Sequence, residues 1–190
     1  MSEVITALQK ASRAGALSET AVQFAGLLER QDPEADPSVL LAGALAAERA
    51  LAGDVCIDLA SIGGSIAWEG DSDGDLVAPD FSIWQQALWR CSLVGDGERL
   101  SPLVLTDDGR LYLYRYYALE CRLAEAIGRH ARQVSHSVDA LSLAQGLDTF
   151  FSDDPGSADQ RAAAAKAVDQ HLLVISGGPG TGKTATVVRI

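Results

Sequence analysis

The sequence predicts an α+β fold, with a helical amino-terminal bundle, a small antiparallel hairpin and then the truncated start of an α/β domain. Apolar residues recur at helical spacing through the first fifty residues, and two apolar runs flank the turn Asp107-Asp108-Gly109. A glycine-rich segment follows the apolar run at residues 172–176. The 190 residues are 47% apolar, which is enough to build a core and excludes disorder over the whole length.

Three helices are expected before residue 52. The first ends at Gly15. Ser18 is the expected N-cap of the second helix, and Asp36 followed by Pro37 starts the third. The apolar faces of the first two helices consist of Val4, Ile5, Leu8 and Ala11, and of Val22, Phe24, Leu27 and Leu28. Because the third helix is apolar nearly all round, it is expected at the centre of the bundle.

The middle of the chain alternates short apolar segments with turns. Residues 54–62 alternate as a strand does, and residues 69–75 form a polar loop rich in glycine and aspartate. Asp80 is the expected N-cap of a helix whose buried face consists of Phe81, Trp84, Leu88 and Cys91. The three tryptophans are interpreted as core or interface anchors rather than as a base-stacking platform; they are Trp68, Trp84 and Trp89.

The clearest hairpin covers residues 102–117, where Gly109 supplies the positive φ of the turn. Its second strand is expected to carry four tyrosines, interleaved with arginine; the residues are Tyr112, Tyr114, Tyr116, Tyr117, Arg110, Arg115 and Arg122. Two alternatives stay open: a hairpin face packed on helices or on a partner, which we favour, and a nucleic-acid patch. A further helix follows, with an apolar stripe made of Leu119, Leu123 and Ile127.

A domain boundary is expected near residue 155. Residues 132–151 favour one more helix, and residues 152–159, with the sequence SDDPGSAD, have the composition of a linker. We therefore assign residues 1–155 to an amino-terminal domain and residues 156–190 to the start of a second domain.

Net charge, cysteine content and the lack of long apolar runs argue against several classes of protein. The formal charge is −11 and the pI is near 4.6, so this stretch alone is a poor nucleic-acid binder. The widely spaced Cys56, Cys91 and Cys121 favour buried free thiols over a disulfide or a metal site. The amino terminus lacks the apolar segment of a signal peptide, and no apolar run reaches the roughly eighteen residues of a membrane span. We therefore expect a cytoplasmic protein with no membrane contact.

The most specific motif is GGPGTGKT at residues 177–184, a full match to the phosphate-loop pattern G-x-x-x-x-G-K-[ST]. Its glycines let the backbone turn tightly and point successive N–H groups at a phosphate. The preceding run LLVIS is typical of a buried parallel strand, and KTATVVRI begins a helix. This order predicts the start of a P-loop NTPase domain. The expected ATP-binding residues are Gly177, Gly178, Pro179, Gly180, Thr181, Gly182, Lys183 and Thr184.

Two side chains of the motif are the expected catalytic residues. Lys183 is a mobile charge that can bridge the β- and γ-phosphates, and the hydroxyl of Thr184 is the expected Mg²⁺ ligand. Upstream, Gln160 lies near the start of a predicted helix, seventeen residues before Gly177. Since an amide both donates and accepts, Gln160 suits the N6/N7 edge of adenine and predicts selection of ATP over GTP. The alternative is a solvent-exposed glutamine on the helix surface.

These segments resemble a known family. DQRAAAAKAV, followed by HLLVISGGPGTGKTATVVRI, resembles the glutamine motif and the first helicase motif of superfamily 1 DNA helicases. GDVCIDLASI and PLVLTDDGRLYLYRYYALECRLAEAI, with its Arg-Tyr-Tyr and Glu120, are similar to the amino-terminal domain of the RecD family, the alpha subunits of exodeoxyribonuclease V. The resemblance covers most of the chain, is most specific at the loop and is weakest in the first fifty residues.

The resemblance implies a 5′→3′ ATP-driven DNA helicase subunit within a three-subunit helicase–nuclease that processes broken DNA ends in repair and recombination. It also implies partners: the amino-terminal domain docks on the large non-motor subunit, and DNA binds to motor domains that the 190 residues do not include. The acidic strand that positions Mg²⁺ and water, and the arginine finger, are likewise missing. Since only six residues follow Thr184, we expect a fragment that does not hydrolyse ATP alone.

Other readings stay open. Residues 1–128 can act as a protein–protein docking module with no catalytic activity of its own, or the chain can begin another P-loop ATPase, such as a AAA-type remodeller, which shares PGTGK. In the isolated chain, residues beyond about 156 are expected to be poorly anchored, because the strand at residues 172–176 has no sheet partner.

Overall fold

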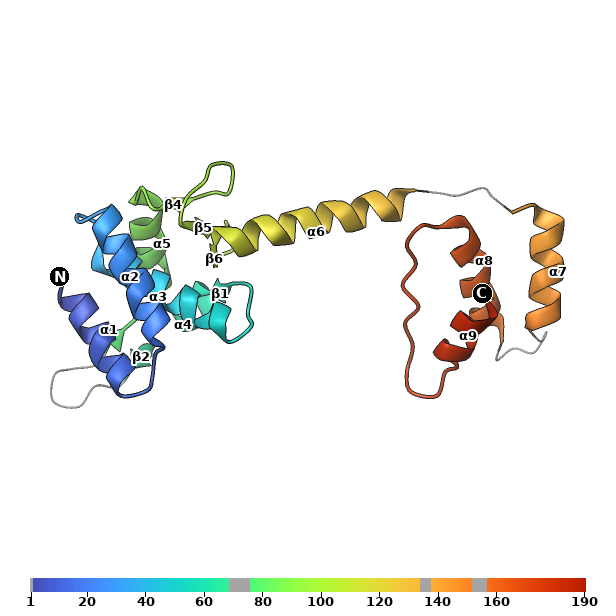
Figure 1. Cartoon of the computed structure of the whole chain (residues 1–190), viewed down its shortest axis with the longest axis horizontal. Helices are drawn as coiled ribbons and strands as arrows, with labels where there is room; N and C mark the ends of the chain where they lie inside the picture. The colour runs from blue at the N-terminus through green and yellow to red at the C-terminus, as the bar shows by residue number, and fades with distance from the viewer. Residues whose placement is uncertain (1, 69–75, 134–137, 152–156) are drawn as a thin grey trace. The chain divides into compact units, whose positions relative to one another are not determined.

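The computed structural model describes residues 2–68, 76–133, 138–151 and 157–190 (Figure 1). The chain folds as two compact units that divide between Cys121 and Arg122, and each unit is described by itself. The predicted loop at residues 69–75 and most of the predicted linker lie outside the described residues. The boundary at residue 155 therefore stays a prediction.

The predicted three-helix bundle is confirmed in the first unit. Its helices are α1 (Glu3–Arg13), α2 (Glu19–Gln31) and α3 (Pro37–Leu51). The central helix is α3, which packs on α1, α2 and α5 and on the sheet. The inward face of α2 is made of Ala21, Val22, Ala25 and Leu28. The prediction for Leu27 is wrong, because one helical step turns it away from Leu28 and leaves it 41% exposed.

Polar side chains fix the starts of these helices. Ser18 Oγ accepts a hydrogen bond from the Ala21 N–H at 3.2 Å, and Asp36 Oδ1 accepts from the Ser38 N–H at 2.8 Å. Both predicted N-caps are thereby confirmed. The N–H of Ser18 donates to Glu48 Oε2 at 2.8 Å, which ties the start of α2 to α3.

A four-stranded sheet packs against α3. Its order is β1–β6–β5–β4, with β6 antiparallel to both of its neighbours and β4 parallel to β5. The strands are β1 (Ile57–Asp58), β4 (Val94–Gly95), β5 (Leu103–Leu105) and β6 (Arg110–Leu113). The predicted hairpin is the β5–β6 pair, and Gly109 has a φ of 84° in its turn. An added Cβ at Gly109 would also lie 2.7 Å from the ring of Phe81. Both the positive φ and the lack of space therefore require glycine at this position.

The strand predicted over residues 54–62 is wrong except at β1. Helix α4 (Leu59–Ile62) begins directly after it, because Asp58 Oδ1 accepts a hydrogen bond from the Ala60 N–H at 3.0 Å and caps the helix. A separate two-stranded sheet, absent from the sequence prediction, consists of β2 (Ile66–Trp68) and β3 (Leu76–Val77).

Helix α5 (Phe81–Arg90) confirms the helix expected after Asp80, although the Asp80 side chain makes no capping bond. Trp84 is fully buried, and its Nε1 donates to the carbonyl oxygen of Ser38 at 2.8 Å. Trp84 is therefore a core anchor, whereas Trp89 on the same helix is 42% exposed. The rest of the predicted face is buried at Leu88 and half-buried at Phe81 and Cys91.

Helix α6 (Tyr114–Arg132) begins where the hairpin strand was expected to continue, so the prediction of a strand through Tyr117 is wrong. The ring of Tyr117 packs edge-on against Tyr112 of β6, with centroids 5.5 Å apart and an interplanar angle of 75°. The Tyr112 hydroxyl donates to Glu120 Oε1 at 3.5 Å, and burial raises the pKa of Tyr112 to about 12. These contacts favour the packed face over the nucleic-acid patch, because both rings are used within the fold.

The described residues of the second unit include the end of α6 and the helices α7 (Ala140–Phe150), α8 (Ala158–Asp169) and α9 (Lys183–Arg189). Helix α8 packs on α7 and on α9. Part of the helix predicted over residues 132–151 falls on residues 134–137, which lie outside the described residues. Helix α7 confirms the prediction over residues 140–150, whereas Arg132 is the last residue of α6 and residues 133, 138, 139 and 151 are not helical.

The buried strand predicted at residues 172–176 is not formed. The segment is irregular, and Val174 in its middle is 81% exposed. A strand requires a neighbour for its backbone hydrogen bonds, and no strand of the described residues pairs with this one. The expected exposure of this apolar segment is confirmed at Leu172 and Val174.

The cysteines are free, as predicted, but they are half-buried rather than buried; they are Cys56, Cys91 and Cys121. No cluster of three or more His, Cys, Asp or Glu side chains suited to a metal occurs among the described residues. Within the same residues, every helix is too short or too polar to cross a membrane.

Candidate nucleotide-binding site

The glycine-rich loop connects the exposed apolar segment to α9. Gly180 and Gly182 have φ values of 78° and 76°, in the left-handed region where a side chain is strained. At Gly177 an added Cβ would lie 2.7 Å from Thr181 Oγ1, which itself donates to the Gly178 carbonyl at 2.9 Å. The loop conformation therefore requires glycine at positions 177, 180 and 182. At its tip, Pro179 and Gly180 form an exposed turn.

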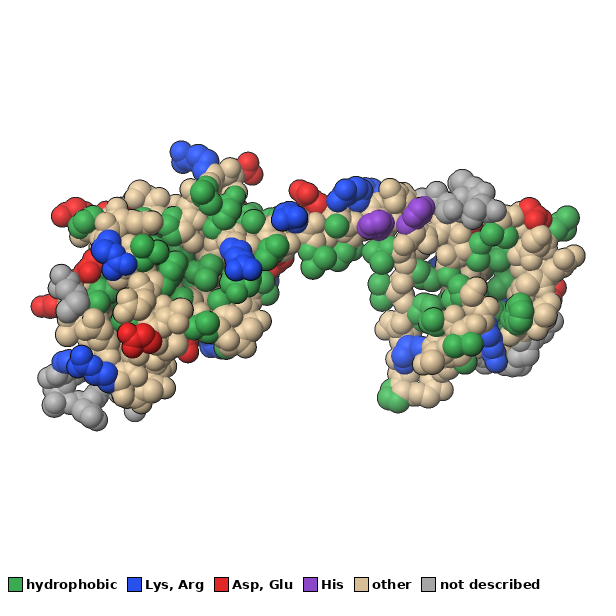
Figure 2. Space-filling model, viewed as in Figure 1, with side chains coloured by type: hydrophobic (Ala, Val, Ile, Leu, Met, Phe, Trp, Pro, Cys, Tyr) green, Lys and Arg blue, Asp and Glu red, His purple; other side chains and the backbone are tan. Residues whose placement is uncertain are grey.

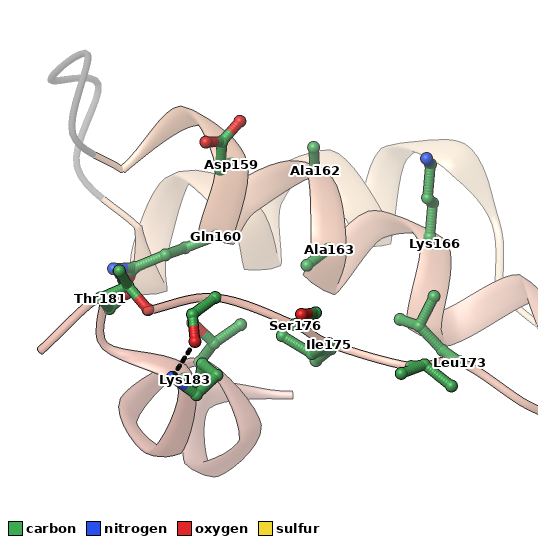
Figure 3. A pocket seen from close by; sticks show the side chains of 13 residues that line it. Asp159, Gln160, Ala162, Ala163, Lys166, Leu173, Ile175, Ser176, Thr181 and Lys183 are labelled. Carbon is green, nitrogen blue, oxygen red and sulfur yellow. Dashed lines mark hydrogen bonds between the residues drawn. The ribbon is translucent and has the colours of Figure 1, made fainter. Parts of the chain in front are cut away.

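Lys183 is the first residue of α9, and its side chain lies along the loop (Figure 3). Its Nζ donates to the carbonyl of Gly177 at 2.6 Å and to that of Gly178 at 2.7 Å. An ammonium group has three N–H donors, so one donor stays available for a further acceptor. Phosphate oxygens are charged acceptors and form stronger hydrogen bonds with an ammonium than carbonyls do. The predicted phosphate-binding cation therefore lies on the predicted loop.

Gln160 extends from α8 to the same loop (Figure 3). Its Nε2 donates to the carbonyl of Thr181 at 3.3 Å, and an added Cβ at Gly182 would lie 2.6 Å from that nitrogen. The structure thus brings Gln160 and Lys183 to one loop from two helices. The amide has two N–H donors and one carbonyl acceptor, so the bond to Thr181 uses one N–H and leaves a donor and the acceptor for another group.

Thr184 lies in the first turn of α9, and its side chain is exposed and accessible to a metal ion. A hydroxyl together with phosphate oxygens and water is a ligand set that suits Mg²⁺. Thr186, two residues further on, is only 1% exposed, and its hydroxyl donates to the Gly182 carbonyl at 3.0 Å. Of the two hydroxyls, that of Thr184 is the exposed one, and its role as a Mg²⁺ ligand stays a prediction.

A cavity of about 540 Å³ lies between α8, the exposed apolar segment and the loop (Figure 3). That volume falls in the range of small-molecule sites, which combine apolar walls with a few polar groups. Its apolar lining includes Ala162, Ala163, Leu173 and Ile175, and its polar lining includes Gln160, Ser176, Thr181 and Lys183. The residues present therefore fit a nucleotide with Mg²⁺: glycines where a Cβ would collide, one ammonium and one accessible hydroxyl.

Two charged residues of this cavity are absent from the sequence prediction, namely Asp159 and Lys166. They lie seven residues apart on α8, a spacing that places them on the same face of a helix. The sequence shows this spacing, but it does not show which face of α8 packs beside the loop.

Comparison with known proteins identifies the family. The family model described as "RecBCD enzyme subunit RecD, N-terminal domain" matches residues 13–112, more than half of the chain. The chain belongs to this family. The RecD match lies wholly within the first unit and includes the α2–α3 pair and all of the hairpin except Leu113.

The chain is also similar in sequence to individual curated RecD proteins. "RecBCD enzyme subunit RecD" of Mycolicibacterium smegmatis is 37% identical over 163 residues, which are 83% of this chain and 26% of the relative. The protein of that name in Mycobacterium tuberculosis is 35% identical over 183 residues, 94% of this chain and 28% of the relative. The chain thus spans about a quarter of the length of these RecD relatives. The Mycobacterium tuberculosis match covers 94% of this chain, so it must extend into the second unit. The similarity to RecD proteins therefore continues past residue 112.

A relative matched over a shorter length, "RecBCD enzyme subunit RecD" of Haemophilus influenzae, is 36% identical over 86 residues, which are 43% of this chain and 13% of the relative.

Proposed function

We propose that the chain is the amino-terminal part of an ATP-dependent 5′→3′ DNA helicase subunit. In this proposal the subunit acts within a helicase–nuclease that repairs and recombines double-strand DNA breaks. Membership of the RecD family is the observation that carries the proposal. The first unit docks on the other subunits, the loop at residues 177–184 binds ATP and Mg²⁺, and DNA binds to further motor domains.

The geometry of the loop supports the nucleotide-binding part of this proposal. Backbone N–H groups of a loop rich in glycine can approach phosphates closely, because no side chain stands in the way at those positions. Lys183 would neutralise phosphate charge, and Thr184 would hold Mg²⁺. Hydrolysis of bound ATP would supply the free energy, Mg²⁺ would offset the phosphate charge, and the residues of this chain would bind and orient the phosphates.

The position of the family match supports the docking part. Residues 13–112 lie in a unit with its own hydrophobic core, and the match ends well before the loop. This also favours a second candidate function, a docking module with no catalytic activity of its own. Pull-down of the partner subunits with a chain shortened to residue 156 locates the docking surface, because retained binding places it wholly upstream of the loop. ATP-dependent strand separation by the full-length protein is what distinguishes the helicase subunit from a docking module.

Strand separation tests the proposed function directly. The full-length protein, supplied with ATP and Mg²⁺, is expected to unwind a duplex that carries a single-stranded 5′ tail and to leave one with a 3′ tail intact. The measurement is release of a fluorescent strand over time. No ATP-dependent release would contradict a helicase, and release only from 3′ tails would contradict the polarity. The 190-residue chain alone is expected to show no ATP turnover.

Gln160→Ala tests the adenine assignment. We expect the preference of the full-length protein for ATP over GTP to fall roughly tenfold, the effect of losing about 1.4 kcal/mol of hydrogen bonding to the base. The measurement is competition of ATP and GTP against a fluorescent ATP analogue. Gln160→Glu is the matched variant, because a carboxylate keeps the acceptor and loses the donor. If Gln160 only braces Thr181, both nucleotides weaken equally and the preference is unchanged.

A further inference from the structure

Thr181 occupies a position that the phosphate-loop pattern leaves open. The pattern G-x-x-x-x-G-K-[ST] admits any residue immediately before its second glycine. In the structure, both the side chain and the backbone of Thr181 form hydrogen bonds. Its Oγ1 donates to the Gly178 carbonyl at 2.9 Å, and its own carbonyl accepts from Gln160 Nε2 of α8 at 3.3 Å. Thr181 therefore connects the turn of the loop to α8.

The Gly178 carbonyl is shared between the Thr181 hydroxyl and the ammonium of Lys183. Lys183 Nζ lies 2.7 Å from the carbonyl oxygen, and Thr181 Oγ1 lies 2.9 Å from it. A carbonyl oxygen has two lone pairs, so it can accept from both donors at once. If one donor turns to another acceptor, the other donor still satisfies this oxygen.

Binding of a triphosphate by Lys183 requires the ammonium to release one of its two carbonyls. An ammonium has three N–H donors, and the carbonyls of Gly177 and Gly178 accept from two of them. One donor remains, whereas bridging the β- and γ-phosphates uses two. The Gly178 carbonyl is the easier one to release, because the Thr181 hydroxyl continues to donate to it.

The charge of the surrounding chain does not replace these local donors. Acidic side chains outnumber basic ones among residues 138–190. Backbone and uncharged side chains make up most of the face of these residues that Figure 2 shows. Since a segment of negative net charge does not attract a triphosphate, the affinity depends on how readily the Lys183 ammonium turns to the phosphates.

We infer that Thr181 is a positioning residue of the nucleotide site. Its hydroxyl holds the Gly178 carbonyl and thereby lets the Lys183 ammonium turn from the loop to the phosphates. The inference rests on the proposed binding of ATP and deepens it, because it gives a role to a side chain that the motif does not specify. Thr181 acts through Lys183, so its hydroxyl needs no contact with the nucleotide.

Thr181→Val in the full-length protein tests the inference, because valine has a similar shape and lacks the hydroxyl. We expect the affinity for a fluorescent ATP analogue to fall about fivefold, the effect of losing one neutral hydrogen bond. Thr181→Ser keeps the hydroxyl and should restore the affinity to within about twofold of the original. Thr149→Val is the matched control, since the Thr149 hydroxyl donates to a backbone carbonyl of α7 at 2.7 Å, outside the cavity. It should leave the affinity unchanged.

A double-mutant cycle separates action through Lys183 from a general effect on the shape of the loop. In a Lys183→Ala background, Thr181→Val should change the affinity by less than about twofold, because the ammonium that the hydroxyl assists is absent. A hydroxyl that only shapes the loop would instead weaken binding about fivefold in both backgrounds.

Four results would overturn the inference while ATP binding itself stands. They are an unchanged affinity of Thr181→Val, no recovery with Thr181→Ser, an equal loss with Thr149→Val, and an equal loss in the Lys183→Ala background. If the unsubstituted full-length protein does not bind the ATP analogue, the proposed nucleotide site is wrong and the inference is wrong with it. The affinity of the unsubstituted protein therefore distinguishes the two failures.

Discussion

Lys183→Ala is expected to abolish ATP-dependent strand separation by the full-length protein and to weaken ATP binding by about a hundredfold or more. The Nζ of Lys183 lies 2.6 and 2.7 Å from two carbonyl oxygens of the loop, the region where a β-phosphate would enter. Each hydrogen bond to a charged group contributes roughly 1.5–3 kcal/mol, and bridging two phosphates involves two of them. Titration with a fluorescent ATP analogue gives the affinity, and phosphate release gives the turnover.

Lys166→Ala is the matched control for this prediction. Lys166 lines the same cavity and carries the same charge, but it comes from α8 and has no hydrogen bond with the loop. It should retain most of the affinity and turnover. The removed Lys183 ammonium leaves only the carbonyls of Gly177 and Gly178, both exposed residues that water can reach, so loss of folding is not expected. Equal losses for the two variants would show that the cavity attracts phosphate by charge alone.

The helices of the first unit were predictable because short-range chemistry decides them. Ser18, and Asp36 with Pro37, mark helix starts whatever the surroundings are, and the structure forms both caps. The error at Leu27 has a different origin. Alanines at positions 21 and 25 take the inward face of α2, and a sequence pattern that counts large apolar residues gives them too little weight.

The strands were less predictable because their lengths depend on distant partners. Asp58 ends β1 because its side chain caps α4. Ile66 pairs with Val77, and the local sequence around each of these residues does not show that the two segments pair. Tyr112, Tyr114 and Tyr116 alternate as strand residues do, yet α6 begins at Tyr114, and Tyr117 contacts Tyr112 from the first turn of this helix. The alternation alone does not reveal this contact, because in a strand Tyr112 and Tyr117 would lie on opposite faces.

The candidate site also combines features that the sequence predicts with features that depend on how distant segments pack. The motif specifies glycine at positions whose φ values or close contacts exclude other residues, and the structure agrees with it at Gly180 and Gly182. The contact between Gln160 and Thr181 depends on how α8 packs beside the loop, which no local pattern contains. The strand expected at residues 172–176 can form only beside another strand, and no strand of the described residues pairs with this segment.

Trp84→Ala is expected to lower the free energy of unfolding of the first unit by about 3–5 kcal/mol, a large part of the stability of an ordinary domain. Trp84 is 0% exposed, and its indole N–H donates to the Ser38 carbonyl of α3, so alanine leaves a cavity and removes a hydrogen bond between α5 and α3. Urea unfolding followed by circular dichroism gives the change without relying on tryptophan fluorescence. Trp89→Ala, on the same helix but 42% exposed, should cost less than about 1 kcal/mol. Since the two variants remove identical side chains from one helix, similar losses would mean that the core is not centred on Trp84.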